Sequence, residues 1–165
     1  MHRLIVVLLL LAACAAPVPP TRPYRDIAKP IYSSAVLQTG RLEGRWVQVA
    51  AFGPADGGCK PGGAEFSPGP GGLQATLRLC LGGSDVQSSG PLTPAGPGRF
   101  AVNGFAGPWW VLWADADLRT LVVGTPSGSF GFILNRDGAL PADRLAAARE
   151  ILDWNGYDLG QLRVW

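Results

Sequence analysis

The feature that most constrains the fold is a series of short apolar runs, separated by turn-forming residues, between Gly44 and Arg136. Glycine and proline are abundant, with 23 and 15 residues, and they punctuate this series. Runs that recur about every 11 or 12 residues are typical of an antiparallel barrel or sandwich, in which tight turns join neighbouring strands. We therefore predict eight strands, at residues 46–52, 64–66, 73–81, 85–90, 98–103, 109–113, 121–124 and 130–135.

A helical periodicity follows the last predicted strand. Pro141 suits the first turn of a helix and Gly156 suits the position just beyond its end. We expect a helix over 141–155 that lies with one face on the outer wall of the strands. The apolar side chains that would form this face are Leu145, Ala148, Ile151 and Leu152.

Two cysteines flank a predicted hairpin. Pairing the runs on either side of the Pro–Gly-rich turn at 67–72 places Phe66 opposite Leu73 and Cys59 opposite Cys80. The same register gathers apolar side chains on one face and polar ones on the other. We therefore predict a disulfide between Cys59 and Cys80, which should stabilise the fold by roughly 3 kcal/mol.

The first residues have the composition of an export signal. Residues 4–11 are an unbroken apolar run that is too short to span a bilayer, and it leads directly to Leu11-Ala12-Ala13-Cys14. This sequence resembles the bacterial lipobox, in which the cysteine is lipidated and becomes the new N-terminus. We predict a lipoprotein signal peptide at 1–13, with lipidation at Cys14. Cleavage of an ordinary signal peptide after an Ala-x-Ala site is the alternative.

The segment that follows is rich in proline. Residues 14–40 contain five prolines and few large apolar side chains, which predicts a linker that holds a domain away from a membrane. The domain itself is expected at 41–165. An exported, lipid-anchored chain of this kind is expected in a bacterial cell envelope, and most simply in the outer membrane facing the periplasm. Its acyl chains, of the palmitate type, would make the anchoring effectively permanent.

Charge and residue types exclude several functions. Loss of Arg3 with the signal leaves 13 basic residues against 12 acidic ones, a formal net charge of +1 that would not attract nucleic acid. His2 is the sole histidine and is also lost, so no imidazole remains to activate a serine or to bind zinc. We therefore predict a protein that is not an enzyme and that carries no metal or other cofactor.

Three ordered segments resemble the conserved regions of lipocalins. Gly44-Arg45-Trp46 resembles the Gly-x-Trp that opens the first strand. The stretch 113–124, which includes Asp115, resembles the acidic turn between the sixth and seventh strands, and 132–136 resembles the end of the last strand with its arginine. The expected helix and its tail resemble those of bacterial lipocalins, many of which are lipoproteins.

The resemblance covers residues 41–165 and implies a particular architecture. It implies an all-β fold, an eight-stranded antiparallel up-and-down β-barrel with one C-terminal α-helix packed on the outside. In such a barrel Trp46 closes the floor and Arg136 stacks over its ring, a cation–π contact. Gly44, Trp46, Asp115 and Arg136 are then structural residues.

The barrel would hold a small apolar or amphiphilic ligand, such as a fatty acid or lysophospholipid, which it would bind, store or transport. Eight strands leave an interior that is either filled by side chains or wide enough for one small ligand. Alternation along the strands selects eleven residues as the cavity wall. They are Phe52, Phe66, Leu73, Leu77, Trp109, Val111, Trp113, Val122, Phe130, Phe132 and Leu134.

Arg78 or Arg99 would meet a ligand head group if either lay near the open end, although a surface arginine is more often simply solvated. The alternative function is a protein-binding barrel without a cavity, similar to periplasmic protease inhibitors or to an envelope scaffold.

Overall fold

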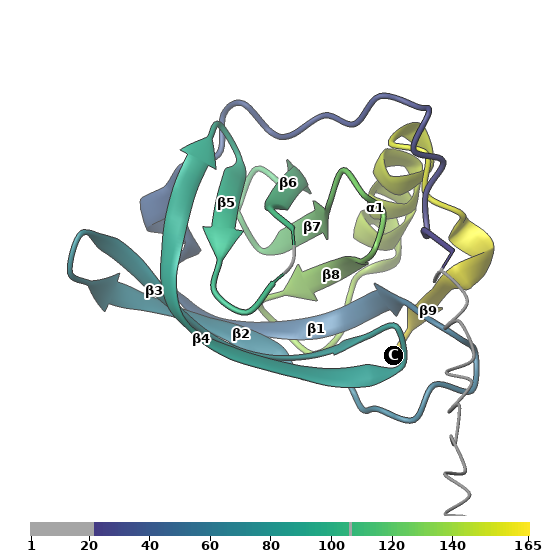
Figure 1. Ribbon diagram of the computed structural model, residues 1–165, viewed down its shortest axis with the longest axis horizontal. Coiled ribbons are helices and arrows are strands. Elements are labelled where there is room, and N and C mark those ends of the chain that lie inside the picture. Colours follow the sequence, from purple (N-terminus) through teal and green to yellow (C-terminus); the bar gives the residue numbers. More distant parts are fainter. Residues whose placement is uncertain (1–21, 106) are drawn as a thin grey trace, which may run out of the picture.

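The computed structural model describes residues 22–105 and 107–165, which form a closed antiparallel barrel (Figure 1). Each strand pairs with the next along the chain, and β1 closes the barrel by pairing with both β8 and β2. The predicted eight-stranded up-and-down barrel is therefore confirmed. Its strands are β1 (Gly44–Phe52), β2 (Gly63–Gly69), β3 (Gly72–Leu81), β4 (Ser84–Gly96), β5 (Arg99–Val102), β6 (Trp109–Ala114), β7 (Thr120–Gly124) and β8 (Gly131–Asn135).

Two ends of the barrel can be distinguished. The first, which we call the floor, is covered by the 3-10 helix η1 (Thr39–Leu42) and carries the turns that follow β2, β4 and β6. The second, which we call the mouth, carries the loops that follow β1, β3, β5 and β7. Because the strands alternate in direction, each strand runs from one end to the other.

The hairpin of β2 and β3 has the predicted faces but not the predicted register. Phe66 pairs with Ala75 instead of Leu73, because the two-residue turn, Pro70 and Gly71, is centred one residue later in the chain than the predicted turn at 67–72. This shift moves the partner of each residue by two positions, which leaves the inward and outward faces unchanged. Apolar side chains of both strands therefore still face inward, as predicted.

The disulfide between Cys59 and Cys80 is present, with a Cα–Cα distance of 5.5 Å. Cys59 lies in the loop before β2 and not in the paired part of the hairpin. The bond is therefore confirmed, although the register from which it was predicted is wrong. It joins the β1–β2 loop to the end of β3 at the mouth.

The helix α1 (Ala142–Trp154) packs on the outside of the barrel, over β6 and β7, as expected (Figure 1). After it, the 3-10 helix η2 (Leu159–Gln161) leads into a ninth strand, β9 (Leu162–Val164). This strand was not predicted, and it pairs with β1 at Ala50–Phe52. It is only three residues long, too short to show a strand alternation in the sequence.

Apolar residues are buried on both sides of the barrel wall. The interior cluster fills the barrel from Leu42 and Trp46 at the floor to Phe130 at the mouth. The outer cluster lies between the barrel wall, α1 and the C-terminal segment. Its buried members are Val49, Ala50, Phe52, Leu112, Val122, Ile133, Ala148, Leu152 and Tyr157.

The N-terminal segment 22–38 lies along the outside of the barrel and crosses the helix end (Figure 1). Tyr24 N–H donates to the carbonyl of Gly128 at 2.8 Å, in the β7–β8 loop at the mouth. The guanidinium of Arg25 is buried and donates to the carbonyls of Asn155 and Pro126 at 3.0 and 2.7 Å. The described chain therefore begins beside the mouth.

Candidate ligand-binding site

The inner wall of the barrel is apolar, and it contains most of the residues that alternation selected. Eight of the eleven lie in the interior cluster. They come from four strands, β2, β3, β6 and β8, and from the loop before β8, so that they surround the barrel axis on several sides. These residues are Phe66, Leu73, Leu77, Trp109, Val111, Phe130, Phe132 and Leu134.

Phe52 and Trp113 were expected in the interior but belong to the outer wall. Each lies beyond an irregularity in its strand, between Gln48 and Ala50 in β1 and between Val111 and Trp113 in β6. A bulge inserts one residue and exchanges the two faces of the strand beyond it. The prediction failed because regular alternation was extended past both bulges.

Val122 also faces outward, for a different reason. All five residues of β7 are buried, since α1 covers the outer face of this strand. A strand buried on both faces gives no polar–apolar alternation to read. Its register with β8 pairs Leu121 with Leu134 and Val123 with Phe132, and so Leu121 and Val123 are the inward residues that the sequence reasoning missed.

Aromatic rings fill the barrel near the mouth. Phe105, in the loop after β5, meets the rings of Trp109 and Phe130 edge-on, with centroids 5.1 and 5.6 Å apart. Trp109 in turn meets Phe132 at 5.0 Å. Edge-to-face pairs of this kind are favourable because the ring edge is positive and the ring face negative. The residues that close the interior at this end are therefore mainly aromatic.

Two buried polar atoms at the same end have no hydrogen-bond partner among the residues that the structure describes. They are the indole Nε1 of Trp109 and the hydroxyl Oγ1 of Thr125. Trp109 is 2% exposed and Thr125 is fully buried. Buried polar groups in folded proteins are normally paired, so these two atoms mark a place where the apolar wall offers hydrogen bonds.

The floor has the arrangement that the resemblance implied. The guanidinium of Arg136 lies over the ring of Trp46 at 3.8 Å, and the Trp46 indole N–H donates to the carbonyl of Leu42 at 2.8 Å. Arg136 also donates to the carbonyls of Glu43 and Arg41, at 2.7 and 2.9 Å. Burial lowers the pKa of Arg136, as does the charge of nearby Arg119.

Two further residues of this end act through the backbone. Gly44 has φ = 95°, and a Cβ there would stand 3.1 Å from Nη1 of Arg136. Asp115 accepts from the backbone N–H groups of Arg119 and Thr120 at 2.7 and 2.6 Å, which closes the turn between β6 and β7. Gly44 thus leaves room for the Arg136 side chain, and Asp115 stabilises the β6–β7 turn. Both residues lie outside the interior wall.

Comparison with known proteins agrees with this geometry. Residues 97–165 match the family model of a lipocalin-like domain. The fold is lipocalin-like. The cockroach major allergen Per a 4 superposes with a TM-score of 0.62 at 12% identity, over 84% of this chain and 94% of that one. Insecticyanin from the tobacco hornworm Manduca sexta gives 0.60 at 14% identity, over 82% and 84% of the two chains.

The family match begins just before β5, so it includes the second and third motifs but not Gly44 and Trp46. No curated protein matches the chain in sequence. The lipocalin-like barrel is thus supported by its C-terminal sequence and by its structure as a whole.

Neither arginine considered for a head group faces the interior of this lipocalin-like barrel. Arg78 is exposed on the outer face and forms an ion pair with Asp85 at 3.3 Å. Arg99 stacks on Trp110 at 3.9 Å and donates to the hydroxyl of Ser33 at 2.9 Å, which ties the N-terminal segment to the outer wall. A polar contact to a ligand in the barrel must therefore come from other side chains.

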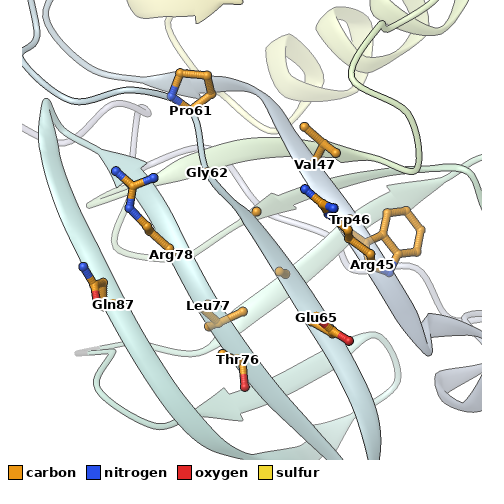
Figure 2. A pocket seen from close by; sticks show the side chains of 12 residues that line it. Arg45, Trp46, Val47, Pro61, Gly62, Glu65, Thr76, Leu77, Arg78 and Gln87 are labelled. Atoms are coloured by element: carbon orange, nitrogen blue, oxygen red, sulfur yellow. The ribbon is translucent and has the colours of Figure 1, made fainter.

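Two surface depressions of the lipocalin-like barrel lie outside its interior. One of about 480 Å³ crosses the outer faces of β1 to β4, where Arg45, Glu65, Arg78 and Gln87 surround it (Figure 2). Its lining mixes these polar side chains with apolar ones such as Val47 and Pro61, and it is separate from the inner wall. A more apolar hollow of about 360 Å³ lies at the rim of the floor, beside Leu73 and Leu92.

Other candidate sites can be placed briefly. Cys14 lies outside the described residues. Within 22–105 and 107–165, no three His, Cys, Asp or Glu side chains gather as a metal site would require. In that same part of the chain, no helix is both long and apolar enough to cross a membrane.

Proposed function

We propose that this protein is a lipocalin that binds a small apolar or amphiphilic ligand, of the fatty acid or lysophospholipid type, within its barrel. The main support for this proposal is the inner wall, which is apolar from Trp46 at the floor to Phe130 at the mouth. Burial of apolar surface supplies about 0.8 kcal/mol per methylene, so a wall of this kind favours an alkyl chain. A catalytic role has no support in the residues that line the wall.

Space for the ligand must come from the side chains that now occupy the interior. Ala51, Ala64 and Ala75 are small members of the inner wall and leave room for larger neighbours to change rotamer. The rings of Phe130 and Phe132, whose centroids are 6.1 Å apart, and the indole of Trp109 are bulky groups that a ligand entering at the mouth would meet. Binding therefore requires repacking of the aromatic end of the barrel.

We further propose that the barrel is a lipoprotein anchored through Cys14, in the outer membrane and facing the periplasm. Cys14 lies eight residues before Arg22, a separation that even a fully extended chain spans in under about 30 Å. The described chain starts beside the mouth, where Tyr24 binds Gly128. An anchor at Cys14 would thus keep the mouth close to the bilayer from which a lipid ligand comes.

The ligand proposal is tested by native mass spectrometry of the Cys14→Ser protein, which keeps the whole barrel. The protein is offered a fatty acid and a lysophospholipid of equal chain length, each at micromolar concentration. A one-to-one complex with either supports the proposal, and its loss in Ala75→Phe, which fills the interior, places the ligand there. The absence of any complex overturns it.

A protein-binding barrel is the second candidate, because the interior is filled by side chains. A barrel of this type would be rigid and would use its outer surface or rim. It predicts that Ala75→Phe leaves function unchanged while substitutions on the outer face, such as Arg45→Glu, abolish association with a partner. The same two variants therefore separate the two functions.

A further inference from the structure

Two polar atoms at the mouth lack a partner among the described residues, and they belong to the residues just beyond one end of the β6–β7 ladder. The ladder ends with the pair Trp110 and Gly124, and Trp109 and Thr125 are the next residues beyond this pair. Trp109 is a member of the interior cluster, and the Thr125 hydroxyl lies 3.0 Å from where a Cβ on Gly107 would stand. Trp109 in β6 and Thr125 just after β7 therefore each present a buried polar atom that has no partner among the described residues.

The chemistry of these atoms limits what can pair with them. An indole N–H only donates, whereas a threonine hydroxyl both donates and accepts. A single oxygen atom between them satisfies both groups if it accepts from Trp109 and either accepts from or donates to Thr125. Carbonyl and hydroxyl oxygens have this capacity.

The surroundings argue against a charged oxygen. The neighbours of Trp109 are the rings of Phe105 and Phe132, which are apolar. A cation beside the β7–β8 loop is Arg25, whose guanidinium donates to the carbonyls of Asn155, Pro126 and Lys29. A carboxylate placed here would lose its hydration without gaining a free cation, which is costly, whereas a neutral oxygen loses much less.

We propose that Trp109 Nε1 and Thr125 Oγ1 bind the neutral carbonyl or hydroxyl oxygen of an otherwise apolar ligand. The ester of a monoacyl lipid and the hydroxyl of a fatty alcohol are examples of this class. The inference rests on the proposed function, and it refines it: within the expected ligands, the ester carbonyl of a lysophospholipid suits this site better than the carboxylate of a fatty acid.

The test compares ligands that share a twelve-carbon chain and differ in the polar group. Dodecanol, methyl laurate, laurate and dodecane are offered to the Cys14→Ser protein at pH 8, where laurate is ionised. We expect the alcohol and the ester to bind about tenfold more tightly than dodecane, the size of effect that one or two hydrogen bonds give. We expect ionised laurate to bind more weakly than the ester.

Two nearly isosteric variants identify the site. Trp109→Phe and Thr125→Val should each weaken dodecanol binding about fivefold, the value of one neutral hydrogen bond, and leave dodecane binding unchanged. Trp110→Phe is the matched control, since this neighbouring indole lies under Arg99 on the outer face. A control variant that weakens dodecanol binding as much as Trp109→Phe does would overturn the proposal.

A second readout, measured on the protein with Trp109 and Thr125 in place, comes from the indole N–H signals of the six tryptophans in a ¹H–¹⁵N spectrum. The Trp109 signal, assigned through the variant, should move downfield on addition of dodecanol and stay in place with dodecane. Equal binding of all four ligands, or a structure with a water molecule between the two atoms in the complex, overturns this inference alone. Failure of all four ligands to bind overturns the proposed function as well.

Discussion

The side-chain amide of Gln48 takes the place of a strand partner for Cys80. Its Nε2 donates to the carbonyl of Cys80 at 2.9 Å, and its Oε1 accepts from the N–H of the same residue at 2.8 Å. β2 begins only at Gly63, so at Cys80 this side of β3 has no neighbouring strand. A glutamine side chain in β1 thus completes the ladder of the barrel wall.

We therefore predict that Gln48→Leu destabilises the fold by about 2–4 kcal/mol, because it leaves a buried N–H and a buried carbonyl unpaired. Urea denaturation should show a lower midpoint with an unchanged m-value. Gln87→Leu, on the exposed face of β4, is the control and should change stability by less than about 0.5 kcal/mol. Equal effects of the two substitutions would contradict this account of the ladder.

Tyr157 predicts a loss of stability at alkaline pH. Its ring lies against Gly124 and Gly131, which pair with each other and where a Cβ would come within 2.5 and 2.8 Å of Tyr157 atoms. Its hydroxyl accepts from Thr125 N–H and donates to the carbonyl of Phe130, both at 2.9 Å. Burial raises the pKa of Tyr157 to about 12, against a smaller lowering by the bond to Thr125 and by the charge of Arg25.

The direction of this change in stability follows from the protons that Tyr157 binds in the folded and unfolded states. Between pH 10 and pH 12 the folded state keeps the tyrosine proton that the unfolded state has lost, so stability falls as the pH rises. The free energy of unfolding should decrease by about 2–3 kcal/mol over this interval, since each unit of pKa shift is worth about 1.4 kcal/mol. Tyr157→Phe is less stable at neutral pH but should lack this slope. A slope of equal size in both proteins would assign it to other groups.

Arg136 is expected to stabilise the floor. Arg136→Met keeps the aliphatic stem but removes the stacking on Trp46 and the bonds to backbone carbonyls, which should cost about 1–2 kcal/mol. Arg119→Met is the control, because the ion pair of Arg119 with Asp137 is exposed and should contribute little. Denaturation followed by tryptophan fluorescence measures both. If Arg136→Met lost no more stability than Arg119→Met, the contacts of Arg136 at the floor would contribute no more than an exposed ion pair.

The anchor is tested at Cys14. The native chain, expressed in a bacterium with lipoprotein processing, should sediment with membranes, and Cys14→Ser should appear in the soluble fraction. Acyl chains hold a protein to a bilayer through about 0.8 kcal/mol per buried methylene, so the shift should be complete. Cys59→Ser together with Cys80→Ser controls for the loss of cysteine. A native chain already in the soluble fraction would exclude the anchor.

Strand number and the terminal helix were predictable because both follow from periodic patterns. The inward faces of β2 and β3 were also predictable, since a turn centred one residue later changes the partner of Phe66 from Leu73 to Ala75, a step of two that preserves the alternation. The existence of the Cys59–Cys80 bond depended on proximity alone, and an error of register did not affect it.

The inner wall was less predictable where local geometry interrupts a pattern. The bulges before Ala50 and Trp113 leave no mark in composition, so Phe52 and Trp113 were assigned to the wrong face. Val122 was misassigned because its strand is covered on both sides. The hydroxyl of Thr125, which has no partner among the described residues, lies just beyond the end of β7, where strand alternation does not predict which way a side chain points.

The hydrogen bond from Tyr24 to Gly128 places the start of the described chain beside the mouth, and this has a kinetic consequence. With acyl chains on Cys14, the mouth would sample a shell of solution only about 30 Å deep next to the bilayer. Confinement of this kind raises the effective concentration of membrane lipid at the barrel, as it does for any tethered pair. Ligand exchange would then depend on how often the mouth meets the membrane surface, and little on the concentration of lipid free in water.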